Sequence, residues 1–254
     1  MRDSDQQAAS HQHPRLKTFV QVAVDQQVYP TSQRLKRYVQ ILFRDVDVSG
    51  ARVLDIGGGD GRWSFAAWAL GARAVTCLEP CDDGGNPEHQ EVYEAMSRAL
   101  MCADTVQRCP LTLQAFEPDE AYDVVLMHAS INHLDEQACS RLHNCPQARR
   151  TYTRILGRIW EICSPGAAVI IVDASRHNIA PQLGIRNPWA STIEWTKHQQ
   201  PRVWAQALSW SGFRPDTVHW LAPTRLGPLG EHLMGNSLAA WLTTSLFRLR
   251  ATRQ

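Results

Sequence analysis

A glycine-rich segment flanked by acidic residues is the part of this sequence whose residue types and spacing best suggest chemistry. Gly57, Gly58 and Gly59 follow Asp55 at the end of a short apolar run, and Glu79 lies 20 residues after Gly59. Glycines placed after a strand let the backbone turn sharply and approach a ligand closely. A carboxylate at the end of the next strand can accept two hydrogen bonds from a ribose diol. Together these features predict a site for an adenosine-type cofactor.

The spacing of the glycines distinguishes two kinds of adenosine cofactor. A dinucleotide site has the pattern G-x-G-x-x-G, but Arg62 stands where the third glycine would be. Asp60 would also place a negative charge beside a pyrophosphate. Asp55 suits a ligand that carries an ammonium group and no phosphate. S-adenosylmethionine, with its sulfonium, amino acid tail and ribose, is such a ligand.

The elements that must position these residues alternate between strands and helices. Apolar runs predict strands at 52–56, 74–78, within 105–114, and at 122–127, 167–173, 216–221 and 245–250. Helices are predicted at 62–70, 88–101, 135–163 and 203–210. This alternation indicates an α/β fold, a mostly parallel doubly wound sheet with helices on both faces.

Four segments carry a family resemblance. Val53-Leu-Asp-Ile-Gly-Gly-Gly-Asp-Gly61 resembles motif I of the class I S-adenosylmethionine-dependent methyltransferases, and Leu78-Glu79-Pro80 resembles the acidic end of their second strand. Tyr122-Asp-Val-Val-Leu-Met-His128 is similar to their fourth strand, and Ser164-Pro-Gly166 matches the turn into their fifth. The resemblance covers about residues 50 to 175. It implies a seven-strand sheet with the order 3-2-1-4-5-7-6 and an antiparallel last strand.

The resemblance also implies roles around the cofactor. Gly57 and Gly59 would lie against its methionine portion and Asp55 near its amine, while Glu79 would bind the ribose hydroxyls. The full set expected at the cofactor is Asp55, Gly57, Gly58, Gly59, Glu79, Pro80, Gln114, Ala115, Phe116 and His128.

The adenine end departs from the family pattern. Many relatives carry an acid after strand three that meets the adenine amino group, but the matching segment, 113–116, has none. Gln114 or a backbone group would then bond the adenine edge, and Phe116 would pack on the ring.

Three histidines are candidates for a general base, because histidine titrates near neutral pH and a base is needed only when the acceptor loses a proton. His128 and His133 lie at and after the fourth expected strand, and His198 follows Glu194 by four residues. Each also has a structural interpretation. His128 can pack beside the cofactor, His133 can cap the next helix, and Glu194 can form a solvated helical pair with His198. Both interpretations stay open.

The acceptor pocket is expected around the loops after the fourth and fifth strands. The residues predicted to bind the acceptor are Asn132, His177, Trp189 and Trp195. Six of the nine tryptophans fall between Trp189 and Trp241, and they could form an aromatic wall around a flat acceptor. Most of them, Trp204 included, are expected in the core.

The domain organisation follows from these patterns. Residues 1–14 are expected to be a disordered tail and 15–49 a helical N-terminal cap. The methyltransferase-like domain would span 50–254, with a lid or substrate-binding insertion at about 174–201.

Composition excludes several classes of protein. The chain has 254 residues with 26 Lys+Arg, 25 Asp+Glu and a net charge of +1, so bulk charge favours neither nucleic acid nor an anionic membrane. No apolar stretch is long enough for a membrane span. The seven cysteines form no CxxC pair, which favours reduced thiols in a cytoplasmic protein. Cys139-x3-His143-x-Cys145 lacks a fourth ligand, so no metal is expected.

The sequence therefore predicts a methyltransferase that uses S-adenosylmethionine to modify a small molecule at oxygen, nitrogen or carbon, mainly by proximity, as a monomer or homodimer. The absence of Asn-Pro-Pro-Tyr and Pro-Cys motifs after the fourth strand disfavours DNA methylation. Two alternatives remain: an NAD(P)-dependent oxidoreductase, and a homologue that binds the cofactor without transferring methyl.

Overall fold

A computed structural model of the chain describes residues 14–80 and 87–254. The tail expected at 1–14 therefore lies, apart from Pro14, outside the described residues. No helix in the described ranges is long and apolar enough to cross a membrane.

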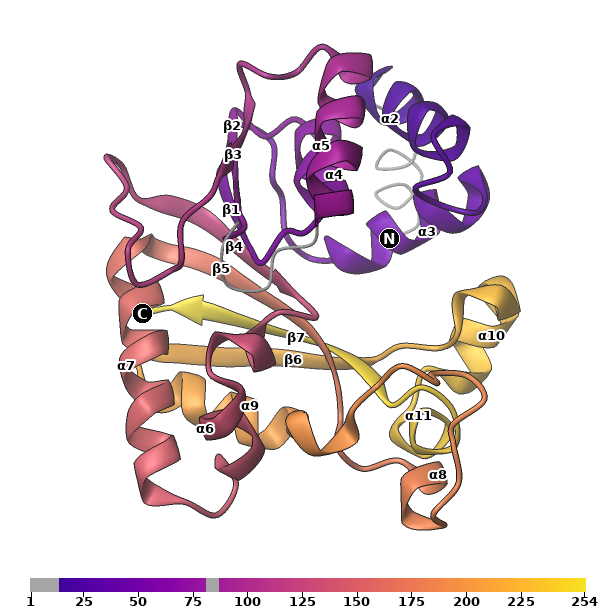
Figure 1. Cartoon of the computed structure of the whole chain (residues 1–254), viewed down its shortest axis with the longest axis vertical. Helices are drawn as coiled ribbons and strands as arrows, with labels where there is room; N and C mark the ends of the chain where they lie inside the picture. The colour runs from indigo at the N-terminus through magenta and orange to yellow at the C-terminus, as the bar shows by residue number, and fades with distance from the viewer. Residues whose placement is uncertain (1–13, 81–86) are drawn as a thin grey trace, which may run out of the picture.

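Seven strands in the described residues form one sheet with the order β3-β2-β1-β4-β5-β7-β6 (Figure 1). Strand β7 runs antiparallel to both of its neighbours, and the other pairs are parallel. Both the α/β fold and the predicted strand order are confirmed. The strands are β1 (Arg52–Ile56), β2 (Ala74–Leu78), β3 (Val106–Cys109), β4 (Tyr122–His128), β5 (Cys163–Ala174), β6 (Phe213–Trp220) and β7 (Leu246–Arg253).

Helices cover both faces of the sheet, which explains why the central strands are continuous apolar runs. One face packs against α2 (Pro14–Asp25), α3 (Ser32–Leu42), α4 (Arg62–Ala69) and α5 (Pro87–Leu100). The other packs against α6 (Glu136–Arg141), α7 (Pro146–Ile162) and α9 (Pro201–Trp210). Trp204 is fully buried in this second core, but Trp210 is exposed and Trp220 and Trp241 are only partly buried, so the expectation that most of these tryptophans lie in the core is wrong.

Several boundaries differ from the sequence-based expectation. The helix expected over 135–163 is two helices, α6 and α7, because Pro146 occupies the first turn of α7 and starts a new helix there. Strand β5 begins at Cys163 rather than 167, and β3 ends at Cys109, directly before Pro110. Strand β6 begins at Phe213 and contains a register shift between Pro215 and Thr217.

The N-terminal helices are fixed to the sheet by buried polar contacts. Thr31 caps α3 by accepting a hydrogen bond from the Arg34 amide. Arg248 on β7 is fully buried and donates to the carbonyl of Leu42 at 2.7 Å and to that of Arg44 at 2.6 Å. The end of α3 is thereby held against the sheet.

Two connections after the fifth strand carry short helices. The predicted insertion at 174–201 contains α8 (Ile179–Gln182) and the 3-10 helix η2 (Trp195–Lys197). Between β6 and β7 lie η3 (Thr224–Leu226), α10 (Gly227–Met234) and α11 (Ser237–Leu242), which the sequence analysis did not predict. Glu231 on α10 pairs with Arg37 and Arg44, so this second connection is joined to the N-terminal helices.

Candidate active site

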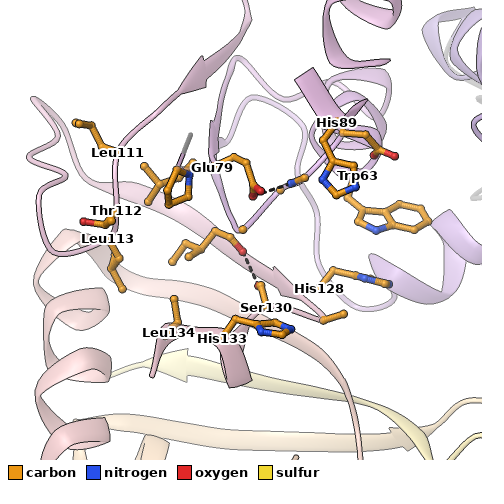
Figure 2. A pocket seen from close by; sticks show the side chains of 18 of the residues that line it. Trp63, Glu79, His89, Leu111, Thr112, Leu113, His128, Ser130, His133 and Leu134 are labelled. Carbon is orange, nitrogen blue, oxygen red and sulfur yellow. Dashed lines mark hydrogen bonds between the residues drawn. The ribbon is translucent and has the colours of Figure 1, made fainter. Parts of the chain in front are cut away.

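A cavity of about 860 Å³ opens at the carboxyl ends of β1, β2 and β4. Its walls come from the glycine loop between β1 and α4, the end of β2, the segment after β3 and the loop after β4 (Figure 2). This edge of an open α/β sheet is where ligands ordinarily bind. Of the sequence-predicted cofactor residues, Gly57, Gly58, Gly59, Glu79, Pro80, Gln114 and His128 line the cavity.

The glycine loop needs glycine for two separate reasons. Gly57 and Gly59 have positive φ angles of +67° and +56°, which side chains rarely adopt. A Cβ atom on Gly57 would also lie 2.5 Å from Cβ of Ser130, and one on Gly58 would lie 2.6 Å from Sγ of Cys77. Ser130 donates a hydrogen bond to the carbonyl of Ile56 at 2.5 Å, so the loop after β4 packs directly on the glycine loop.

Glu79 stands at the end of β2 and faces the cavity. Its Oε2 accepts a hydrogen bond from the Gly59 amide at 3.0 Å (Figure 2). Arg108 donates to the carbonyl of Gly59 at 2.7 Å. The carboxylate is thus joined to the glycine loop from the neighbouring strand, as the sequence spacing suggested.

Asp55 lies behind the glycine loop and does not line the cavity. It is fully buried, and its Oδ2 accepts a hydrogen bond from Ser64 Oγ at 2.7 Å. Its Oδ1 has no hydrogen-bond partner among the described residues. Burial raises the pKa of Asp55 to about 7. The contact with the cofactor amine stays a prediction.

His128 faces the cavity from the end of β4 and contacts a residue of the N-terminal helices. Its Nε2 lies 2.6 Å from the hydroxyl of Tyr38 on α3. The ring of Trp63 packs against both, with centroids 4.9 Å from Tyr38 and 5.0 Å from His128. Burial lowers the pKa of His128 to about 4, so the imidazole is uncharged at neutral pH.

His133 lies on the same cavity wall but is more than half exposed to solvent. Its Nδ1 lies 2.7 Å from Oε1 of Glu136, and Glu136 pairs through its other oxygen with Lys197 at 2.9 Å. Hydrogen bonds from Lys197 and His133 hold the pKa of the Glu136 carboxyl below its ordinary value. The arrangement presents an imidazole oriented by an ionised carboxylate.

The predicted pairing of His198 with Glu194 is wrong, because His198 pairs with a different carboxylate, that of Asp173. Nδ1 of His198 lies 2.8 Å from Oδ1 of Asp173, at the end of β5 and outside the cavity lining. Glu194 instead accepts from Lys197 at 3.2 Å. The reason is local structure, since η2 is one short turn and does not continue from Glu194 to His198 as a helix.

The other predicted residues lie away from the main cavity. Phe116 is buried in the core, with its ring centroid 6.2 Å from that of Tyr122. Asn132 is also buried. His177 lines a second, smaller cavity of about 320 Å³. The remaining residues outside the lining of the main cavity are Ala115, Trp189 and Trp195.

Sequence reasoning missed several residues that line the cavity: Arg62, Trp63, His89, Thr112, Ser130 and Glu136. The closeness of His133 and Glu136 along the chain was a usable signal, although the two residues lie on either side of the break between η1 and α6 and not on one helical turn. Nothing in the sequence pointed to His89 on α5.

Comparison with known proteins places this geometry in context. A family model described as "Methyltransferase domain" matches residues 27–218. No curated protein shows a match to this sequence.

Solved structures with the same fold include enzymes of more than one kind. A putative S-adenosylmethionine-dependent methyltransferase from Listeria monocytogenes shares 14% sequence identity with this chain, and the TM-score is 0.57. The match covers 87% of this chain and 98% of the Listeria chain. The mitomycin 7-O-methyltransferase MmcR shares 17% sequence identity with this chain, and the TM-score is 0.57. The match covers 89% of this chain and 55% of MmcR. The (4+2)-cyclase SpnF shares 14% sequence identity with this chain, and the TM-score is 0.53. The match covers 88% of this chain and 81% of SpnF. At this level of identity the likeness shows the fold.

Proposed function

This chain belongs to the methyltransferase domain family, and we propose that it transfers the methyl group of S-adenosylmethionine to an oxygen, nitrogen or carbon atom of a small-molecule acceptor. One observation carries the proposal: a single cavity joins the Gly57–Gly59 loop and the Glu79 carboxylate to an imidazole held by a carboxylate, His133 with Glu136. The similarity to the mitomycin 7-O-methyltransferase MmcR and the near-neutral charge of the chain also support a small acceptor.

The residues of the cavity fit this cofactor. The glycines leave the backbone open to a ligand, and the Glu79 carboxylate can accept hydrogen bonds from two ribose hydroxyls. His89 lines the cavity beside Gly59. Pro80 and Gln114 would lie toward the adenine.

The bound cofactor supplies an activated methyl group on a sulfonium and its own leaving group. The protein's part is to bind the acceptor, hold it in line and exclude water. His133 is the residue suited to take a proton from the acceptor. Because its Nδ1–H donates to Glu136, its Nε2 lone pair is free to accept that proton.

The segment between β5 and α9 is suited to close over the acceptor. Lys197 in this segment pairs with Glu136 of the cavity wall, and Cys139 donates to the carbonyl of Lys197 at 3.2 Å. This contact supports the predicted lid at 174–201, with Trp195 beside the acceptor. The roles of Asn132, His177 and Trp189 stay predictions.

The second candidate function is binding of the same cofactor without methyl transfer. The (4+2)-cyclase SpnF has a similar fold, so this architecture also hosts other chemistry.

Calorimetric titration with S-adenosylmethionine, S-adenosylhomocysteine and NADH tests the cofactor. We expect binding of the first two only. Glu79→Ala should weaken that binding roughly 10- to 100-fold, because hydrogen bonds to charged groups contribute about 1.5–3 kcal/mol. Glu117→Gln, at an exposed carboxylate outside the cavity lining, is the matched control. NADH binding, or no binding of either sulfur compound, would refute the proposal.

A second assay distinguishes the two candidate functions. S-adenosylhomocysteine formation is measured with a panel of phenols, amines and carbon acids as acceptors. Acceptor-dependent formation supports methyl transfer. Tight cofactor binding with no turnover across the panel would favour the second candidate.

A further inference from the structure

We propose that Tyr38 is a positioning residue that holds the proton of His128 on Nδ1 and, together with burial, disfavours a second proton, so that the cavity does not repel a cationic sulfonium. The inference rests on the proposed function, because the sulfonium is the group that an imidazolium would repel. It assigns a task in the active site to a residue of the helical N-terminal cap that the sequence predicted.

The hydrogen bond between the two side chains has a defined direction. The hydroxyl of Tyr38 lies 2.6 Å from Nε2 of His128, and no other acceptor for that hydroxyl exists among the described residues. Tyr38 is only 9% exposed, and a buried hydroxyl proton requires an acceptor. Tyr38 therefore donates to Nε2, and the proton of the neutral imidazole resides on Nδ1.

The surroundings keep this arrangement in place. Trp63 packs on both rings, and Tyr29 meets the edge of Trp63 at 6.3 Å between centroids. A proton added to Nε2 would leave the Tyr38 hydroxyl proton without an acceptor inside this aromatic cluster. Burial also raises the pKa of Tyr38, so this hydroxyl stays protonated.

The charged groups around His128 also oppose its protonation. Tyr38 faces it from α3. Arg62, at the start of α4, disfavours a second positive charge, and Asp60, which would favour one, is engaged in an ion pair with Arg62. The other titratable groups that line the cavity are Glu79, His89, His133 and Glu136. They are the same in the wild type and in the variants proposed below.

The charge of His128 matters because it shares the cavity with the glycine loop. S-adenosylmethionine carries a sulfonium, whereas S-adenosylhomocysteine has an uncharged thioether at the same position. An imidazolium would weaken binding of the first compound and not that of the second. The ratio of the two dissociation constants therefore reports the charge of His128, independently of catalysis.

Tyr38→Phe tests the inference, because it removes the hydroxyl and keeps the ring. Tyr29→Phe is the matched control, since Tyr29 belongs to the same cluster without contacting His128. Thermal unfolding of each variant verifies that it is folded. NMR of histidine-labelled protein then gives the tautomer and the pKa of His128, and calorimetry gives both dissociation constants between pH 8 and 4.5.

In the wild type and in Tyr29→Phe we expect His128 to carry its proton on Nδ1 and not to titrate above pH 5. In Tyr38→Phe its pKa should rise by about one unit or more, because the bond that stabilises the neutral ring is gone. Calorimetry extended to pH 4.5 should then show a ratio of dissociation constants, S-adenosylmethionine over S-adenosylhomocysteine, about threefold higher than in the wild type, because a pKa raised by one unit leaves most of the imidazole charged at that pH.

Three results would overturn the inference: a proton on Nε2 in the wild type, titration of His128 near its ordinary pKa, or a ratio in Tyr38→Phe that follows the wild type at every pH. If neither sulfur compound binds any variant, the proposed function fails and so does the reason given for the neutral ring. The NMR titration would still decide whether Tyr38 controls His128.

Discussion

Nδ1 of His133 lies 2.7 Å from Oε1 of Glu136 on the wall of the main cavity. Of the three histidines that the sequence offered as bases, His133 alone combines access to this cavity with a carboxylate partner. His128 is held by Tyr38, and His198 pairs with Asp173 outside the cavity lining. For this reason His133 is the one of the three histidines that we propose as the proton acceptor.

Glu136→Gln should lower kcat by about tenfold while leaving KM for S-adenosylmethionine within about twofold, because the imidazole loses the group that orients it and the cofactor loses no contact. Steady-state kinetics with a hydroxyl acceptor checks this. Glu194→Gln is the control, since Glu194 also pairs with Lys197 but does not line the cavity. An equal loss of kcat in both variants would show that the effect comes from Lys197 instead.

Gly57→Ala should destabilise the protein by roughly 2–4 kcal/mol, the sum of an unfavourable backbone angle and an overpacked contact. The added Cβ would lie 2.5 Å from that of Ser130. Gly50→Ala separates the two causes, because Gly50 has nearly the same φ, +69° against +67°, and no atom within 4 Å of an added Cβ. Urea unfolding should give a clearly smaller loss for Gly50→Ala. Equal losses would show that the contact with Ser130 relaxes freely.

Asp55→Asn should flatten the dependence of stability on pH. The ordinary pKa of the carboxyl is 3.8, and in the folded protein it is about 7. Between these values the folded state holds more protons than the unfolded state, so the free energy of unfolding falls as pH rises through this window. In the wild type the free energy of unfolding should fall by roughly 2–4 kcal/mol across this window. Denaturant unfolding of both proteins at pH 4.5 to 8 checks this, and a slope that persists in the variant would assign it to another group.

Asp173→Asn should cost about 1–3 kcal/mol of stability, because Asp173 is almost fully buried and its charged hydrogen bond to His198 would be replaced by a weaker one. The control is Asp216→Asn, whose carboxylate pairs with Arg214 and Arg250 at the surface of β6. Thermal unfolding should show a loss within about 0.5 kcal/mol for the control. A loss of similar size in both would mean that the buried pair adds no more stability than a surface one.

The local sequence was sufficient to predict the sheet and the glycine loop. Strand β1 is mainly apolar, through Val53, Leu54 and Ile56, because both faces of the sheet are covered, and this pattern is visible in the residues themselves. The glycines at 57–59 and Glu79 belong to consecutive elements of one strand–helix–strand unit, so their spacing along the chain already brings them together. His133 and Glu136 are also close in sequence, although the extended residue Asp135 separates η1 from α6 between them.

Tertiary structure alone decided the contacts between distant segments. Tyr38 and His128 are 90 positions apart, and Asp173 and His198 are 25 apart. No period or motif encodes such pairs, because they depend on how α3 and the segment after β5 dock on the sheet edge. The sequence analysis placed Tyr38 only within the predicted helical cap at 15–49, and its hydrogen bond to His128 depends on how α3 docks on the sheet. The sequence by itself determined the strands and the cofactor loop through local pattern, whereas long-range packing decided that His128 is buried against Tyr38 and that His198 pairs with Asp173.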